Sequence, residues 1–142
     1  MTENFPRRVV VKEYNGTSWN LVGIENLTDD GRGNTLYVDS DGTPYVAHDH
    51  KYSDKAMVKK FNGTSWENIG TTEFSVGKIA VSTLAMKNNT LYIAYTDITN
   101  NSKPTLMKNV GEDWICLGGT EGFNKEIVEA QDMGGMKSAD LT

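Results

Sequence analysis

The sequence of 142 residues is poor in the side chains that most redox, metal and nucleophilic sites use. It has a single cysteine, Cys116, which excludes an intrachain disulfide. That cysteine lies between Trp114 and Leu117 in an expected strand, a setting that predicts a small buried hydrophobe. Only two histidines are present, and neither a nucleophile elbow nor an HExxH motif occurs. Disulfide-stabilised folds and the common hydrolase motifs are therefore excluded.

The sequence also has no basic run, no long apolar run and no leader-like start. Its formal net charge is −5, whereas nucleic-acid binding needs clustered Lys and Arg. No apolar stretch approaches the roughly 18–20 residues of a membrane span. The first residues lack the apolar segment of a signal peptide. We expect a cytoplasmic protein that binds neither nucleic acid nor membranes.

The sequence does contain a repeat. Residues 14–19, which end Asn-Gly-Thr-Ser-Trp, return almost unchanged as residues 61–66. Trp66 follows Trp19 by 47 residues (66 − 19), and Trp114 follows Trp66 by 48 (114 − 66) in a diverged third copy. A period of this length, carrying short strands and turns, is typical of β-propeller blades.

Four strands are expected in each full repeat. Asp41-Gly42 and Asn62-Gly63 supply the positive φ angles that tight hairpins need. Four antiparallel strands joined by hairpins make one propeller blade. The expected strands cover residues 35–40, 43–49, 55–61 and 65–70 in the first full blade, and 82–87, 90–97, 103–109 and 113–118 in the second.

The two ends of the single domain, residues 1–142, do not coincide with blade boundaries. Residues 7–23 supply only the last two strands of a blade. Residues 119–142 are expected to form a crossing loop and a terminal strand around 128–137, because Met136-Lys137 occupies the place of Met86-Lys87. A short helix over residues 124–133 is the alternative, ended by Gly134-Gly135.

The predicted fold is therefore all-β, a partial β-propeller of four-stranded antiparallel blades with under three blades in each chain. Closed propellers need roughly four to eight blades, and an open arc leaves unpaired sheet edges. We expect the ring to be completed by homo-oligomerisation, with two chains sharing each split blade to give about six blades. A fragment of a longer propeller is the alternative.

The Asn-Gly-Thr-Ser-Trp repeat and the hairpin 41–47 resemble the repeats of bacterial β-propeller proteins over residues 9–118. More distantly, the segment Trp66–Gly70 and the hairpin 35–49 are similar to the tachylectin-2-like propeller lectins. The first resemblance implies the propeller architecture. The second implies binding of amino sugars between blades.

Five aromatic residues are the candidate ligand contacts. Trp19, Trp66 and Trp114 each open the last strand of a blade, and Tyr45 and Tyr92 occupy equivalent strand positions. We interpret them as core residues between blades, because an aromatic ring of this size contributes roughly 2–3 kcal/mol when buried. A sugar-stacking platform repeated in each blade is the alternative.

His48-Asp49-His50 is the one cluster with metal-binding residues. His48 and His50 are expected on the same face of a strand, where two imidazoles and a carboxylate form a weak metal candidate. The second repeat has Tyr95-Thr96-Asp97 instead, so a polar strand end is the favoured interpretation. No metal or cofactor is expected.

The function that this pattern favours is a non-catalytic binding module rather than an enzyme. Propeller rims and the grooves between blades offer repeated concave surfaces for a glycan or a protein. The alternative is a structural, oligomerising scaffold without a small ligand.

Overall fold

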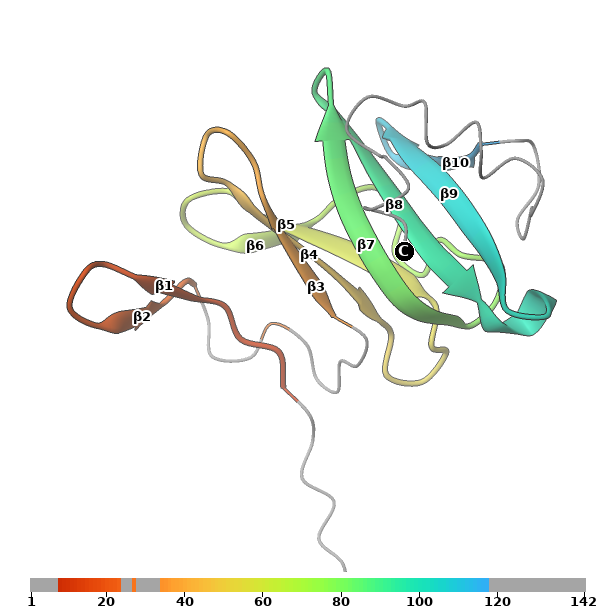
Figure 1. Ribbon diagram of the computed structural model, residues 1–142, viewed down its shortest axis with the longest axis horizontal. Helices are drawn as coiled ribbons and strands as arrows, with labels where there is room; N and C mark the ends of the chain where they lie inside the picture. Colours follow the sequence, from red (N-terminus) through yellow and green to blue (C-terminus); the bar gives the residue numbers. More distant parts are fainter. Residues whose placement is uncertain (1–7, 24–26, 28–33, 118–142) are drawn as a thin grey trace, which may run out of the picture.

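The computed structural model describes residues 8–23, 27 and 34–117 (Figure 1). The predicted terminal strand or helix in residues 119–142 lies outside the described residues, as does most of the loop before residue 34. The strands are β1 (Lys12–Tyr14), β2 (Trp19–Leu21), β3 (Thr35–Val38), β4 (Pro44–Asp49), β5 (Ala56–Phe61), β6 (Trp66–Asn68), β7 (Ile79–Lys87), β8 (Thr90–Asp97), β9 (Lys103–Val110) and β10 (Asp113–Cys116).

The strands form three antiparallel sheets in which neighbours in sequence are neighbours in space. The N-terminal hairpin is β1–β2, the first sheet has the order β3-β4-β5-β6, and the second has the order β7-β8-β9-β10. The one helical element described is the 3₁₀ turn η1 (Ile98–Asn100) between β8 and β9. The prediction of an all-β, antiparallel fold is confirmed.

The repeated Asn-Gly-Thr-Ser sequence is the turn of a hairpin. The Oδ1 atom of Asn62 accepts hydrogen bonds from the backbone N–H groups of Thr64 and Ser65, each at 2.9 Å. Gly63 has a φ angle of +101°, which glycine adopts without a steric penalty. Asn15 makes the same two bonds at 3.0 Å each in the N-terminal hairpin. The sequence identity of the two turns therefore reproduces one local structure twice.

The outermost strands are shorter than predicted and β7 is longer. β6 ends at Asn68, two residues before the expected end, because Gly70 turns the chain with a φ angle of +67°. β7 begins at Ile79 rather than residue 82, with a bulge between Ala80 and Ser82. The bulge adds a residue and breaks the alternation of side chains between the two faces of the sheet. The alternation in the sequence therefore did not predict the first part of this strand.

The main core lies between the first and second sheets. Tyr45, Ala47 and Val58 of the first sheet pack against Leu84 and Ile93 of the second, and Ile93 is fully buried. A side chain of this size contributes roughly 1.5–3 kcal/mol when it is buried completely. The two sheets therefore stabilise each other face to face.

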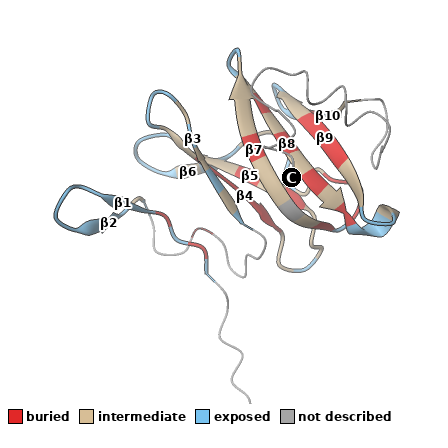
Figure 2. Ribbon diagram, viewed as in Figure 1, coloured by how far each residue is buried: buried red, intermediate tan, exposed pale blue. Residues whose placement is uncertain are grey.

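A smaller core joins the N-terminal hairpin to the first sheet. It consists of Val9, Val11, Leu27 and Val46, with Val22 and Trp66 packed against them. Every residue of β1 and β2 is exposed, as Figure 2 shows for this end of the molecule. The hairpin is therefore attached mainly through residues that flank its strands.

Candidate functional site

A tryptophan of each sheet reaches across to the repeat before it. The indole N–H of Trp66 donates a hydrogen bond to the carbonyl oxygen of Val22 at 2.9 Å. The indole N–H of Trp114 donates to the carbonyl oxygen of Ile69 at 3.0 Å. We call this arrangement the inter-repeat tryptophan contact. It occurs twice among the described residues, with the same donor and acceptor atoms.

A glycine follows each acceptor carbonyl and makes room for the indole. A Cβ atom on Gly23 would lie 2.7 Å from Nε1 of Trp66, and one on Gly70 would lie 2.8 Å from Nε1 of Trp114. Both glycines have positive φ angles, +82° and +67°. Only glycine satisfies the backbone angle and the close approach together.

The rings of Trp66 and Trp114 pack on other aromatic rings. Trp114 stacks on Phe74 with centroids 4.5 Å apart and an interplanar angle of 17°, and is 8% exposed. Trp66 lies against Phe61 at 5.4 Å and is half-buried. The structure thus places both residues between repeats, with their N–H groups engaged by the chain itself.

Trp19 occupies the same hairpin position but is 66% exposed. Its ring touches Tyr14, with centroids 5.3 Å apart, much as Trp66 touches Phe61. No described residue accepts a hydrogen bond from its indole N–H. The hairpin is the same, but no repeat precedes it among the described residues.

The two candidate tyrosines lie in different surroundings. Tyr45 is buried in the main core, and its hydroxyl donates to Oδ2 of Asp39 at 3.3 Å. Burial raises the pKa of the Tyr45 phenol, and the Asp39 carboxylate raises it further. Tyr92 is half-buried on the other face of the second sheet, beside Leu106 and Leu117. The structure does not bring the five aromatic candidates together in one site.

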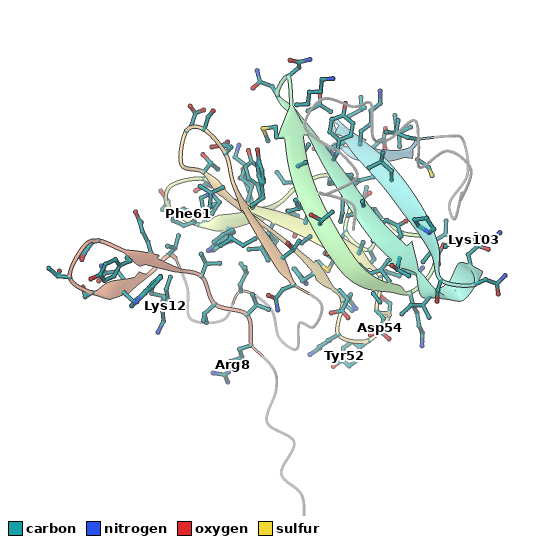
Figure 3. The ribbon with its side chains drawn as sticks, in the orientation of Figure 1. Arg8, Lys12, Tyr52, Asp54, Phe61 and Lys103 are labelled. Carbon is teal, nitrogen blue, oxygen red and sulfur yellow. The ribbon has the colours of Figure 1, made fainter. Side chains whose placement is uncertain are left out.

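A groove of about 690 Å³ lies between the N-terminal hairpin and the first sheet. Lys12 on the hairpin and Phe61 on the first sheet both line it, and Figure 3 labels the two residues. None of the candidate residues from the sequence lines it. Its walls are apolar with charged residues among them: Val11, Lys12, Glu13, Val22, Leu36, Val38, Asp41, Gly42, Thr43, Pro44, Lys60, Phe61, Asn62 and Gly63.

The groove exists because the N-terminal hairpin has two described strands where each sheet has four. β5 and β9 each pair on both edges, whereas β1 pairs with β2 alone among the described strands. Leu36 is 53% exposed, and Leu84, at the equivalent place in the second sheet, is 7% exposed. The equivalence follows from register, since Leu36 pairs with Val46 and Leu84 with Ile93. Leu84 is covered by the first sheet, and Leu36 faces the groove.

The histidine cluster is divided between the core and a turn. His48 is 3% exposed, and its Nδ1 lies 2.9 Å from the carbonyl oxygen of Asp49, which leaves Nε2 without a described partner. Burial lowers the pKa of His48, an effect opposed by the Asp49 carbonyl and strengthened by Lys59.

His50 follows the end of β4, where its Nδ1 accepts long hydrogen bonds from the backbone N–H groups of Tyr52 (3.3 Å) and Ser53 (3.4 Å). The same nitrogen lies 3.6 Å from Oε1 of Glu73. Within the described residues, no three His, Cys, Asp or Glu side chains are grouped so that they could hold a metal ion. The two histidines are held by separate partners.

No helix in the described part of the chain has the length and apolar character needed to cross a membrane. In comparisons with known proteins, the chain matches no protein-family model, no curated protein and no solved structure.

Proposed function

We propose that this chain is a non-catalytic binding module, built as part of a β-propeller that association of copies completes, and that its groove binds an extended protein segment. The groove between the N-terminal hairpin and the first sheet, with the open edge of β1 beside it, carries the proposal. No catalytic group, metal or cofactor is part of it.

The propeller part of the proposal is supported by the repetition of contacts between neighbouring repeats. Each full repeat is a four-stranded antiparallel meander, which is the form of a propeller blade. The first sheet packs on the second and the hairpin on the first, each through one inter-repeat tryptophan contact. The hairpin and the two sheets are thus three successive units joined by one kind of contact, as expected for a repeat architecture such as a propeller.

The choice of an extended segment is supported by the edge of β1. The backbone groups on this edge have no strand partner among the described residues, so a peptide can pair with them by strand addition. Alternate side chains of the peptide would then meet the exposed Leu36 and Val38 across the groove. Lys12, Glu13 and Asp41 supply charges of both signs around this apolar floor.

A protein ligand fits the groove better than a glycan does. Sugar sites use exposed aromatic faces, and the groove has one aromatic residue, Phe61, whose ring already packs on Trp66. Trp66 and Trp114 are engaged between repeats. A glycan is therefore the alternative outcome of the test.

The test is a selection of unstructured peptides from a displayed random library, run beside a glycan array on the same protein. Selected peptides should bind the wild type, and Val38→Glu in the groove should weaken them at least tenfold. Val110→Glu is the matched control, because Val110 is also an exposed strand valine but does not line the groove. Bound peptide should also slow hydrogen exchange at the amides of β1.

Peptide binding that survives Val38→Glu, or no peptide binding at all, would overturn the proposed site. Glycan binding lost in Val38→Glu would replace the peptide with a sugar. Binding in neither assay would favour a structural scaffold.

A further inference from the structure

We propose that Trp19 docks on the carbonyl oxygen of Leu117 in a second copy of this chain, repeating between chains the contact that Trp66 and Trp114 make within one. This inference rests on the proposed association of copies and identifies the atoms that hold the copies together. It joins the exposed Trp19 to the repeat that contains Trp114, after which the 142 residues contain no further tryptophan.

The donor side is supported by the likeness of the hairpins that carry Trp19 and Trp66. Both tryptophans open the outer strand of a hairpin, and both pair with an aromatic residue on the inner strand, Tyr14 or Phe61. The ring centroids lie 5.3 Å apart in one hairpin and 5.4 Å in the other. The ring of Trp19 therefore packs on its own hairpin much as the ring of Trp66 does, with interplanar angles of 40° and 48°.

The acceptor side is supported by three equivalent backbone positions. The N–H groups of Val22, Ile69 and Leu117 donate hydrogen bonds to the neighbouring strand at 2.8, 2.9 and 2.8 Å, to Val11, Val58 and Leu106. The carbonyls of the first two then accept an indole N–H from the next repeat. Leu117 is the third member of this series. In the sequence it is followed by Gly118, as Val22 is followed by Gly23 and Ile69 by Gly70.

The apolar side chains beside Leu117 also match a surface that docks within the chain. Tyr92 and Ala94 hold the positions of Tyr45 and Ala47, since Ala94 pairs with Leu106 as Ala47 pairs with Val58. In the first sheet this face is buried against the following repeat. In the second sheet Tyr92, Ala94 and Leu117 are half-buried in a small separate cluster. A surface of this kind fits another repeat of the same design, which a second copy provides.

The two surfaces are different, so the contact is head-to-tail. Such contacts close into a ring or continue into a filament, and they are not self-complementary. Two variants that each lose one surface should therefore complement each other. Trp19→Ala removes the donor. Gly118→Val is the acceptor variant, because Gly118 follows Leu117 in the sequence as Gly23 follows Val22 and Gly70 follows Ile69, and a Cβ at either of those two glycines would crowd the docked indole.

The experiment measures mass by light scattering on the full chain across micromolar concentrations. The wild type should have at least twice the chain mass of 15.7 kDa, and each variant alone should have 15.7 kDa with an unchanged circular dichroism spectrum. An equimolar mixture of Trp19→Ala and Gly118→Val should contain a complex of two chains. Tyr52→Ala, which truncates another highly exposed aromatic residue, should keep the wild-type mass.

The outcomes separate this inference from the proposed function. A wild-type mass of 15.7 kDa at every concentration would overturn the association itself. An oligomer that persists in Trp19→Ala would overturn the contact and leave association standing. A mixture that stays monomeric would point to a head-to-head contact and also overturn it. The peptide assay on the Trp19→Ala monomer reports on the groove separately, because Trp19 does not line it.

Discussion

The N-terminal hairpin and the hairpin β5–β6 share one turn sequence and one local structure, yet they differ in burial. In both, an asparagine oxygen caps the turn and a tryptophan packs on an aromatic ring across the hairpin. Trp66 has a preceding repeat on which to dock and is half-buried, while Trp19 has none among the described residues and is exposed. Local sequence therefore determines the hairpin, and the neighbouring repeat determines whether its tryptophan stabilises the fold.

The same difference separates the two full sheets. Leu84 of the second sheet is covered by the first, and Leu36 of the first sheet faces the groove beside the two-stranded hairpin. The groove therefore lies where a core would form if four strands stood opposite the first sheet. Its lining is apolar because the equivalent residues of the second sheet are core residues. Changes at the tryptophan contacts test this comparison directly.

Trp114→Ala should have the largest effect. It removes an almost fully buried ring, its stacking on Phe74 and its bond to the Ile69 carbonyl. The expected loss is about 3–5 kcal/mol of unfolding free energy. Denaturant unfolding followed by far-UV circular dichroism measures it. A loss below 1 kcal/mol would mean that the contact does not hold the sheets together.

Gly70→Ala should follow, with a loss of about 2–3 kcal/mol, because overpacking adds to the cost of a left-handed alanine. Its Cβ would lie 2.8 Å from Nε1 of Trp114 and 3.1 Å from the backbone oxygen of Glu112. Gly63→Ala is the matched control, since Gly63 also has a positive φ angle but nothing within 4 Å of its Cβ position. Equal losses in the two variants would show that only backbone strain matters.

Acid should destabilise the protein through His48 by a smaller amount. Burial lowers the pKa of His48 in the folded state below the ordinary value of 6.5, so the unfolded chain binds more protons over this range. The contribution of His48 to the free energy of unfolding is complete above about pH 6.5. It is lost as the pH falls below that value toward the pKa of His48 in the folded state. Unfolding free energies at pH 7.5 and pH 5.5 measure the loss.

His48→Phe supplies the comparison for this measurement, because the equivalent position of the second sheet holds an aromatic residue, Tyr95. The variant should lose less stability than the wild type between the two pH values. The charged and titratable neighbours that act on His48, which are Lys59, Asp49 and His50, remain in both proteins. An equal loss in both would assign the acid sensitivity to other groups.

Trp19→Ala should have the smallest effect on the stability of the monomer, within about 0.5 kcal/mol, because exposed side chains contribute little. The measurement uses the Gly118→Val background, in which the proposed contact between copies is blocked. A loss comparable to that of Trp114→Ala would contradict the comparison, since it would mean that Trp19 is packed within its own chain.

The repeat made the strands predictable from the sequence. The groove could not be predicted, for a physical reason. The spacing of Trp19, Trp66 and Trp114 and the Asn-Gly turns located the hairpins correctly. Side-chain alternation in residues 35–38 indicates that one face is apolar, but it cannot tell which neighbour covers that face. Leu36 is exposed because only two described strands, β1 and β2, stand opposite its face, so its exposure is a property of the assembled repeats.

The roles of the aromatic candidates were predictable to different degrees. A tryptophan at a fixed place in each repeat predicts one contact made repeatedly, as Trp66 and Trp114 show. Tyr45 and Tyr92 are equivalent in sequence, yet among the described residues only Tyr45 has another repeat packed over its face. The histidine cluster was divided by the end of β4, which places His48 in the core and His50 in the following turn.

The acceptor of each inter-repeat tryptophan contact is a main-chain oxygen, and this has a consequence for how such an array can change over time. The two acceptor residues, Val22 and Ile69, have different side chains, because the indole N–H bonds to the peptide carbonyl and not to the side chain. Repeats can therefore drift apart in sequence and still fit any neighbour that keeps its tryptophan and its glycine. Repeats of this kind can therefore be added, removed or exchanged one at a time without a new type of contact between neighbours.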